Sequence, residues 1–497
     1  MSNPKTITPR PDAFQLVCLG LLALYAVFLT WESTPIAGGA DSSGYLTSAR
    51  LITEGRLMQP PRTIPELPLE GHTWVYTPLG MIAGGTDTAL RPTYPVGLPL
   101  HFALASTVLG WDWGPIAVNV AGALALVILT YLGARLLGAG RWVSAAAAGA
   151  LALSPILVFT SIQPLSDTLS ATWNMAAFYC ALRARRAGAG GASWGWSVAC
   201  GAAVAVAVLV RPSDAWLVPA LCLVLGDWRR LLGAFLGGVP GAVLLAWYNH
   251  TLYGSPWVTG YGSIFALIGP EWLIPSLKLY GSWLPRVFPL LVVAALVAPW
   301  LPWRALWREV GALVLWFFAF AGFFALYSCT HEVWWYLRFV LPAFPALAIL
   351  AALGIDRLPA PARVRLAVAM AVVLITGVLG NRIFTRFGVY HMAEGQEPYR
   401  ALAHWARENL PPEAAVMTLH SSASFYFYTD FPVLRSDNIG AETFAALRDR
   451  VRASGRPLYA LLYKYDDEPR RQELIPGDWH EIKRSGDFAL WELRHTP

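Results

Sequence analysis

Long apolar runs separated by short charged connections make up most of the first 385 residues. A helix needs about 20 mostly apolar residues to cross the hydrocarbon core of a bilayer. Eleven runs approach or reach this length: 13–31, 114–134, 142–160, 166–182, 194–210, 212–226, 231–248, 287–303, 309–327, 338–355 and 366–383. The pattern predicts an α-helical polytopic membrane protein with about eleven transmembrane helices, the first of them retained.

A further apolar run, 94–110, does not suit a full crossing, because Pro95 and Pro99 interrupt its start and it is short. The charges of the connections support this interpretation. If 94–110 does not cross, alternate connections, with Lys5 and Arg10, carry 14 basic and 4 acidic residues on one side. Cytoplasmic loops are rich in Lys and Arg. We therefore expect the N-terminus inside, and 94–110 as a helix lying in or dipping into the outer interface.

Polar residues are concentrated in the last hundred positions. Residues 398–497 hold 14 acidic and 13 basic side chains, whereas the chain as a whole is 56% hydrophobic and 14% charged. Soluble domains have about 25% charged residues, so disorder, a fibrous protein and an ordinary cytosolic enzyme are excluded. The net charge of +6 lies between the apolar runs, because the tail sums to −1. Membrane orientation explains that surplus, and we expect no nucleic-acid partner.

These patterns divide the chain into a transmembrane domain, 1–384, and a small extracytoplasmic α/β domain, 385–497. The tail pattern predicts helices at 399–409 and 442–453, strands at 415–419 and 458–463, and an edge or last strand at 488–493. The segment 421–428, with four small residues, Tyr426 and Tyr428, could bind a sugar acceptor. Packing of the fold is the more common use of such tyrosines.

The predicted topology places two long connections, 32–113 and 251–286, on the outer side, where loops commonly carry function. Asp41 follows the first span directly and precedes Tyr45 and a helix-compatible segment. Asp167 lies at the outer end of a later span. Each aspartate could cap the helix that follows it, or could be a functional carboxylate at the membrane edge.

Further motifs lie at compatible depths. They are Tyr94-Pro95-Val96-Gly97-Leu98-Pro99, Arg211-Pro212-Ser213, Asn249 to Gly254 with Gly260-Tyr261-Gly262, and Tyr336-Leu337-Arg338-Phe339-Val340-Leu341-Pro342. Together with the two aspartates, and in this order, they resemble the motifs of the GT-C glycosyltransferases. These multi-span enzymes use polyprenyl-phosphate sugars and include the protein mannosyltransferases and the aminoarabinose transferase of lipid A. Val96 replaces a proline of the family pattern, and Phe339 replaces a tyrosine.

The resemblance implies an inverting transferase of hexosyl or pentosyl groups, with Asp41 as the general base. Glycosyl transfer passes through an oxocarbenium-like state, and the attacking hydroxyl must lose its proton. Arg211 and Arg338 would stabilise the leaving lipid phosphate, although arginines at helix ends also snorkel to the interface. The other residues expected to bind substrate are Asp167, Tyr45, Tyr94, Tyr261 and Tyr336.

His331 and Glu332, beside two tryptophans, do not form an HExxH zinc motif, because Trp335 stands where the second histidine is needed. We interpret them as polar neighbours of an aromatic cluster lining the sugar pocket, and so as substrate-binding candidates. Some GT-C branches bind a divalent cation at their acidic sites. Ser42 stands where the protein mannosyltransferases have a second carboxylate, so a divalent cation is possible but not certain.

The implied partners are a polyprenyl-phosphate-linked sugar donor, a glycan, lipid or protein acceptor, and the lipid bilayer. The implied location is a bacterial inner (plasma) membrane, with the active site and the C-terminal domain outside the cytoplasm. Two alternatives remain. A glycan polymerase, ligase or flippase would depend on arginines of a late outer loop rather than on Asp41. A secondary transporter would have broken spans in symmetric halves.

Overall fold

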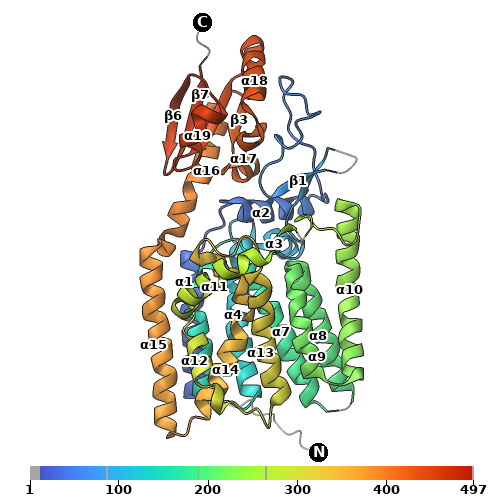
Figure 1. Ribbon diagram of the computed structural model, residues 1–497, viewed down its shortest axis with the longest axis vertical. Helices are drawn as coiled ribbons and strands as arrows, with labels where there is room; N and C mark the ends of the chain where they lie inside the picture. Colours follow the sequence, from blue (N-terminus) through green and yellow to red (C-terminus); the bar gives the residue numbers. More distant parts are fainter. Residues whose placement is uncertain (1–11, 85–87, 189, 264–265, 495–497) are drawn as a thin grey trace, which may run out of the picture.

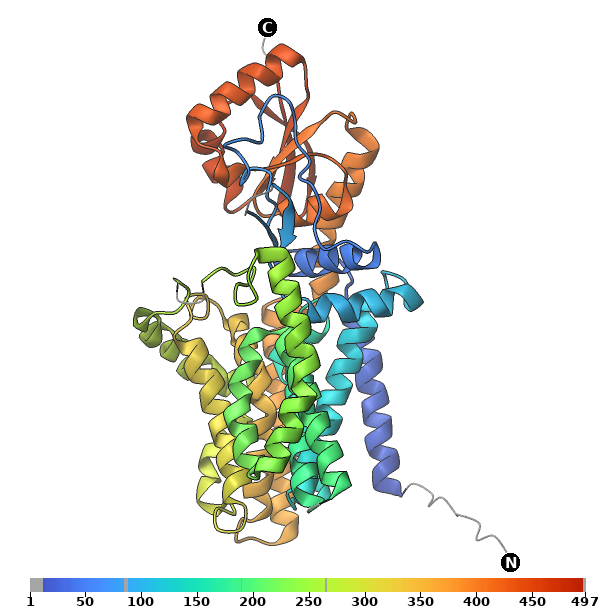
Figure 2. The ribbon, with the colours of Figure 1, turned by 90° about the vertical axis from the view of Figure 1, so that its right-hand side faces the viewer.

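The computed structural model describes residues 12–84, 88–188, 190–263 and 266–494. Figures 1 and 2 show a bundle of long helices, short helices lying across one end of it, and a domain with a β-sheet beyond that end. Lys5 and Arg10, which entered the charge argument, lie outside the described residues. Hydropathy explains this arrangement of the bundle and the sheet domain along the long axis. The apolar runs pack together in the bundle, and the polar tail folds as a separate domain at one end.

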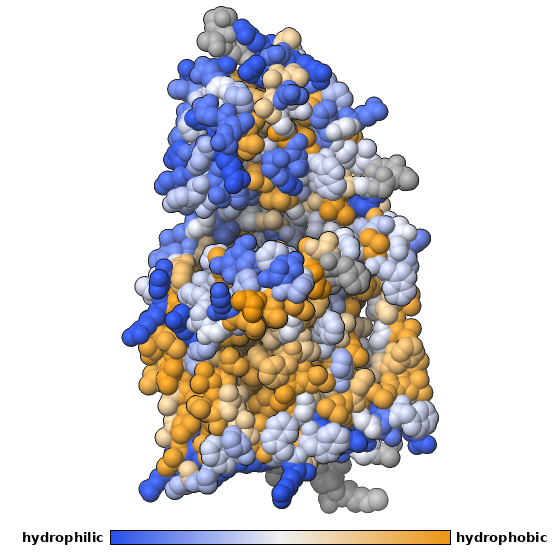
Figure 3. Space-filling view, in the orientation of Figure 1, coloured by the Kyte–Doolittle hydropathy of each residue, from blue (hydrophilic) through white to orange (hydrophobic). Residues whose placement is uncertain are grey.

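Each predicted apolar run contains helix. The main helices of the bundle are α1 (Ala13–Glu32), α4 (Gly114–Leu136), α5 (Arg141–Ala152) with α6 (Pro155–Ser161), α7 (Asp167–Arg186), α8 (Gly191–Val210), α9 (Val218–Leu225), α10 (Trp228–Tyr253), α13 (Trp307–Ala325), α14 (Phe344–Asp356) and α15 (Ala362–Arg386). Among the described residues, seven helices are long and apolar enough to cross a membrane, or nine if each of two bent pairs counts as one span. Figure 3 shows the corresponding apolar band across the face of the bundle in view. The polytopic helical architecture is confirmed, and the number of eleven crossings stays a prediction.

The predicted span 287–303 is wrong as a single helix. Its α-helix, α12 (Leu290–Leu296), has seven residues and meets the preceding helix at a bend of 96°, and only a short 3-10 helix, Ala298–Trp300, follows it. That preceding helix, α11 (Leu273–Val287), lies in the segment assigned to an outer loop. Pro289 comes directly before α12, and a proline lacks the N–H needed to continue a helix. The apolar composition of 287–303 therefore did not produce a continuous span.

Two helices of the first outer loop lie across the end of the bundle, as Figure 2 shows. They are α2 (Ala40–Thr53) and α3 (Gly97–Leu109). The position of α3 agrees with the interfacial helix expected at 94–110. A side chain at Gly97 would collide with the backbone of Leu209 and Val210 at the end of α8. Glycine at this position therefore lets α3 begin directly on the bundle.

Two ion pairs join connections at helix ends that were predicted, from their basic residues, to lie on the cytoplasmic side. Arg141 pairs with Asp12 at 2.9 Å, and Arg185 pairs with Glu309 at 2.7 Å. These connections lie at the end of the bundle opposite the tail domain (Figure 1). The two ends are thus distinct, and which of them faces the cytoplasm stays a prediction.

The tail domain contains one five-stranded sheet with the order β4-β3-β5-β7-β6. The strands are β3 (Ala415–Thr418), β4 (Val433–Arg435), β5 (Leu458–Tyr463), β6 (Trp479–Ser485) and β7 (Phe488–Leu493), and the helices are α16 (Met392–Asn409), α17 (Ser422–Tyr428), α18 (Ala441–Ser454) and α19 (Asp467–Leu474). β3 is parallel to β4 and β5, whereas β7 is antiparallel to its neighbours. The α/β tail is confirmed. β7 is the last strand but not an edge strand, because β6 pairs with its outer side.

The first outer loop completes the core of the tail domain. Ile64, Leu67, Val75 and Tyr76 are buried in one cluster with residues of β3, β5 and α18. The loop also contains the short antiparallel strands β1 (Met81–Ala83) and β2 (Leu90–Pro92). The tail is therefore packed partly by residues more than three hundred positions earlier in the chain.

Candidate active site

Asp41 lies in the first turn of α2 and does not cap that helix. The N-cap residue is Gly39, and no side chain caps the helix, so the interpretation of Asp41 as a cap is wrong. One carboxylate oxygen accepts a hydrogen bond from the Tyr94 hydroxyl at 2.7 Å, and the other pairs with the Arg338 guanidinium. Two distant segments of the chain therefore hold this carboxylate.

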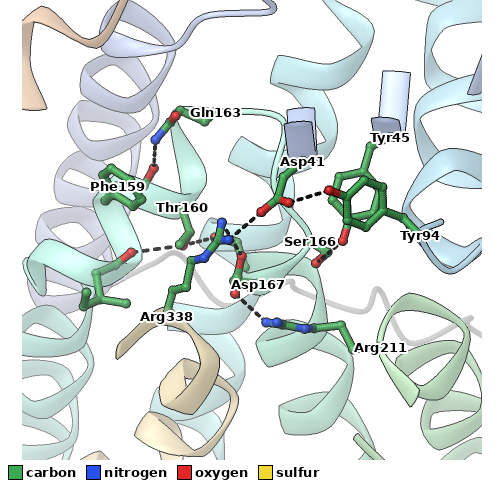
Figure 4. A network of polar contacts seen from close by, with 12 residues as sticks. Asp41, Tyr45, Tyr94, Phe159, Thr160, Gln163, Ser166, Asp167, Arg211 and Arg338 are labelled. Carbon is green, nitrogen blue, oxygen red and sulfur yellow. Dashed lines mark hydrogen bonds and ion pairs between the residues drawn. The ribbon is translucent and has the colours of Figure 1, made fainter. Parts of the chain in front are cut away.

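Asp167 is the second carboxylate of the cluster, and it contacts two arginines. It is the first residue of α7 and makes no side-chain cap bond. One of its oxygens pairs with Arg211, which lies between α8 and the 3-10 helix η1 (Pro212–Leu217). The other is 3.8 Å from Nη1 of Arg338, in the 3-10 helix η5 (Trp334–Ala343). Figure 4 shows Arg338 between the two carboxylates. Both arginines are thus ion-paired within the network rather than extended along the bundle surface.

The two carboxylates differ in exposure. The Asp41 side chain is 33% exposed and the Asp167 side chain 2%. Asp41 is therefore the carboxylate that a substrate can reach. Burial raises the pKa of the Asp41 carboxyl, but the charge of Arg338 and the hydrogen bonds from Tyr94 and Arg338 outweigh burial and lower the pKa overall. Asp41 is accordingly ionised at neutral pH.

Three tyrosines form an aromatic wall beside Asp41. The rings of Tyr45 and Tyr94 are 4.7 Å apart, and Tyr261 meets Tyr94 edge-on at 6.2 Å. The Tyr45 hydroxyl donates to Oγ of Ser166 at 2.9 Å. Burial is the main cause that raises the pKa of Tyr45 to about 12 and the pKa of Tyr94 well above its usual value. Both hydroxyls therefore stay protonated and act as donors.

Two glycines allow the aromatic wall to form. A side chain at Gly44, on α2, would collide with the ring of Tyr94. A side chain at Gly260 would collide with the backbone of Thr93. The Gly-Tyr-Gly sequence therefore lets a late loop approach the first one closely and brings Tyr261 to Tyr94.

Phe339 lies against both arginines of the site. The guanidinium carbons of Arg211 and Arg338 lie 4.9 and 5.2 Å from the centre of its ring. Tyr336 stacks on Phe339 with ring centres 6.0 Å apart. Tyr336 thus borders the arginines, although it makes no direct contact with either aspartate in the described structure.

His331 and Glu332 are not part of this network. The His331 ring stacks on Trp272 at 4.8 Å, and Glu332 is exposed. Within the described ranges, no contact links either residue to Asp41 or Asp167. Their binding of substrate stays a prediction.

Sequence reasoning missed Asp214 and the role of Ser166. Asp214, in η1, is fully buried and accepts a hydrogen bond from Ser170 at 2.7 Å. Ser170 lies on α7 and Asp214 follows Arg211 by three residues, so this bond ties the Arg211 segment to the helix of Asp167. The sequence pattern that could have identified Asp214 is an acidic residue next to Arg-Pro-Ser within an apolar run. Charged residues within a membrane are energetically costly and are usually functional.

The residues at the site do not fit a divalent cation. In the part of the chain that the structure describes, no three His, Cys, Asp or Glu side chains are grouped so that they could hold a metal ion. Asp41 and Asp167 are each paired with arginine, and Arg338 contacts both. Both carboxylates thus already have guanidinium partners.

Comparison with solved structures identifies the fold. The chain is similar to ArnT from Cupriavidus metallidurans bound to undecaprenyl phosphate, with a TM-score of 0.60, 16% identity and coverage of 96% of this chain and 97% of ArnT. It is also similar to the archaeal oligosaccharyltransferase AglB from Archaeoglobus fulgidus, solved with an inhibitory peptide and a dolichol-phosphate. That match has a TM-score of 0.53 and 12% identity, and covers 90% of this chain and 70% of AglB.

No protein-family model matches the sequence, and no curated protein is similar to it in sequence. The chain nevertheless shares the fold of ArnT and AglB, which agrees with the fold expected from its motifs. The resemblance extends over almost the whole length of ArnT and includes the tail.

Proposed function

We propose that this protein is an inverting glycosyltransferase that moves a sugar from a polyprenyl-phosphate donor to an acceptor hydroxyl. Asp41 is the general base. The observation that carries this proposal is a partly exposed, ionised carboxylate at the end of an apolar bundle, paired with one arginine and close to a second. The fold shared with ArnT, solved with undecaprenyl phosphate, supports the same class of donor.

The position of the network suits a lipid-linked substrate. The prenyl chain of the donor lies among the lipid tails, and its phosphate lies at the membrane surface. Asp41 and Tyr94 come from the segments that lie across the end of the bundle, where the apolar band ends (Figures 2 and 3). The sugar bond to be broken therefore lies near Asp41 when the donor is embedded in the bilayer.

The arginines receive the leaving phosphate. Arg338 has a buried Nε with no hydrogen-bond partner among the described residues, so at least one of its five N–H donors remains after both carboxylates are contacted. As the acceptor oxygen attacks the anomeric carbon, its proton passes to Asp41. The bond from that carbon to the phosphate oxygen breaks, and the phosphate keeps the electron pair. Charge-assisted bonds from Arg338 and Arg211 stabilise the added negative charge.

Donor binding also strengthens the base. The charge of Arg338 lowers the pKa of Asp41, which makes the free carboxylate a weak base. A donor phosphate that shares Arg338 weakens this ion pair and raises the pKa of Asp41 towards a value suited to proton transfer. Asp167, buried and paired with both arginines, keeps them in place.

The location that we propose is a bacterial inner membrane, with Asp41 and the tail domain on the extracytoplasmic side. The basic connections at the opposite end of the bundle support this orientation. Acceptor hydroxyls of a glycan, a lipid or a protein are all compatible with the chemistry.

The test measures release of polyprenyl phosphate. Purified protein in lipid nanodiscs is incubated with a panel of polyprenyl-phosphate sugars and a crude envelope acceptor. Asp41→Asn is compared with Asp112→Asn, a control that removes an exposed carboxylate elsewhere in the same outer loop. We expect a loss of 10² to 10⁴ in rate for Asp41→Asn, which is the usual contribution of a general base, and no loss for the control.

If Asp41→Asn released polyprenyl phosphate at the wild-type rate, Asp41 would not be the general base. A polymerase, ligase or flippase would then be the better interpretation if Arg338→Gln still abolished function. Absence of release by wild-type protein from every donor, with acceptor extract from several envelope fractions, would contradict the transferase itself.

A further inference from the structure

A groove of about 420 Å³ on the flank of the bundle lies apart from the candidate active site. It is lined by one face of α15, from Val373 to Arg382, and by Leu153 between α5 and α6. None of its lining residues belongs to the network of Asp41 and Asp167. It lies in the part of the molecule where apolar helices face the bilayer (Figure 3).

Two glycines of α15 give the groove its shape. At Gly380 a Cβ would come within 3.0 Å of the carbonyl oxygen of Leu153, so glycine here permits close approach of the helices. At Gly377 a Cβ would meet only Cδ1 of Leu153, at 3.5 Å. Because Gly377 has no side chain, an open hollow remains above Leu153 instead of a tight contact.

The groove is apolar along its length and polar at the end nearer the tail domain. α15 runs towards that domain in Figure 1, so Asn381 and Arg382 come after the apolar residues of the groove in that direction. Arg382 is exposed and has no ion-pair or hydrogen-bond partner among the described residues. Trp283 and Phe387, whose rings are 5.8 Å apart, lie beside the same end of α15. Aromatic residues mark the level of lipid headgroups.

We propose that this groove binds an anionic glycerophospholipid of the bilayer, with one acyl chain in the hollow at Gly377 and the phosphate on Arg382. An apolar hollow that ends at an unpaired cation matches the two ends of such a lipid. A bilayer phospholipid is favoured over the sugar carrier because the groove shares no residue with the Asp41 network. The inference does not depend on the proposed transferase activity.

The bound lipid would brace a broken span. Leu153, at the base of the groove, lies where α5 ends, and α6 begins at Pro155 with a bend of 60°. At the other end of α6, Thr160 and Ser161 contact the Thr168 hydroxyl at 2.8 and 3.1 Å. Thr168 follows Asp167 directly. An acyl chain against Leu153 therefore supports the segment that leads to the second carboxylate.

Native mass spectrometry tests the site. The delipidated full-length protein is mixed with equal amounts of phosphatidylglycerol and phosphatidylcholine, and retained lipid is counted. We expect wild-type protein to retain one phosphatidylglycerol preferentially. Arg382→Gln should reduce that preference about fivefold, the effect of one arginine near an anionic headgroup. Gly377→Leu, which fills the hollow, should reduce retention of both lipids.

Arg363→Gln is the matched control, because Arg363 is an exposed arginine at the opposite end of α15. It should retain phosphatidylglycerol as the wild type does. Arg382→Gln changes an exposed side chain, so it gives an answer even if Gly377→Leu does not fold. Equal retention by Arg382→Gln and Arg363→Gln would overturn the proposal. Displacement of the retained phosphatidylglycerol by an equal amount of polyprenyl phosphate would also overturn it, and would assign the groove to the carrier.

Discussion

The guanidinium of Arg338 pairs with the carboxylate of Asp41, although the two residues are 297 positions apart in sequence. Asp41 comes from the first outer loop and Arg338 from the 3-10 helix that precedes α14. The pair therefore joins an early and a late part of the chain at the end of the bundle. It also sets the basicity of Asp41, because the charge of Arg338 lowers the pKa of that carboxyl.

Replacing Arg338 should change both the rate and its pH dependence. Arg338→Gln removes the cation, so the pKa of Asp41 rises and the acid limb of the kcat/KM profile moves to higher pH. Loss of a phosphate contact should also reduce kcat/KM by about 10² to 10³, as for other groups that stabilise a leaving oxyanion. The measurement is polyprenyl phosphate release between pH 4 and 9. Arg407→Gln, at an exposed arginine of α16, serves as control. An acid limb that stays at its wild-type position would contradict the role of the pair.

Tyr94→Phe should also raise the pKa of Asp41 and lower the rate, but by less than Arg338→Gln does. The substitution keeps the ring contact with Tyr45 but removes the hydroxyl that donates to Asp41 at 2.7 Å. That bond lowers the pKa of Asp41, so its loss raises the pKa and frees one carboxylate oxygen. A hydrogen bond to a charged group contributes about 1.5 to 3 kcal/mol. The freed carboxylate is no longer held in one orientation, and we expect this misplacement to lower kcat about tenfold or more, with the acid limb shifted less than in Arg338→Gln. If kcat and the limb both match wild type, the Tyr94 bond has no part in catalysis.

Gly44→Ala tests whether close packing of α2 sets the position of Tyr94. A methyl group at Gly44 would collide with the Tyr94 ring, so either the ring or α2 must shift. We expect activity to fall while membrane insertion and overall helicity are retained. Gly149→Ala is the control, because a Cβ at that helical glycine has nothing within 4 Å. Full activity of Gly44→Ala would show that the position of the ring is not critical.

Sequence pattern predicted the spans and the site motifs because both leave local signals. An apolar run must satisfy its backbone within a helix, so α4, α8 and α15 could be placed from composition alone. Asp41, Tyr94 and Arg338 could be found because each lies in a short motif. The ion pair between Asp41 and Arg338 could not be deduced, because it depends on how distant helices pack.

Other features left no pattern to interpret. Ile64, Leu67 and Val75 complete the tail core, but they lie in a proline-rich stretch without the alternation of a strand. The hydrophobic pattern of β7 is the same for an edge and an inner position, and only the pairing with β6 distinguishes them. Asp214 was missed because a single acid in an apolar run does not identify its partner, Ser170.

Arg50 should couple the tail domain to α2, the helix that carries Asp41. It lies on α2, as Asp41 does, with its guanidinium carbon 3.6 Å from the ring centre of Phe427 and Nη1 donating to the Phe427 carbonyl at 3.1 Å. Cation–π contacts contribute about 0.5 to 2 kcal/mol. Arg50→Gln should therefore loosen α17 from α2, lower kcat and speed proteolytic release of the tail. Limited proteolysis measures the rate at which the tail is released, with Arg407→Gln as the control variant. Unchanged cleavage and unchanged kcat would mean that other contacts hold the two parts together.

His420 should make the tail domain more stable at low pH. It lies between β3 and α17, and Nδ1 is 3.1 Å from Oδ1 of Asp467, while Nε2 is 3.4 Å from Asp466. The hydrogen bond with Asp467 is the largest cause that raises the pKa of His420, and the charges of Asp467 and Asp466 raise it further. Burial and the charge of Arg470 lower the pKa, but the net result is an increase. The ring of Tyr463 lies 5.3 Å away.

Because the folded-state pKa of His420 is raised, its stabilising effect is complete below the unfolded value of about 6.5. The effect is lost as the pH rises through the folded value. The His420 side chain is 36% exposed, so solvent screening keeps the contribution to about 1 kcal/mol or less. Hydrogen exchange at 419–422 and 463–467, corrected for the intrinsic pH dependence of exchange, should therefore be slower at pH 5.5 than at pH 8. The difference should disappear in His420→Gln. If His420→Gln keeps the same difference, another group is responsible. If it disappears, the turn that leads into α17 responds to pH through one histidine.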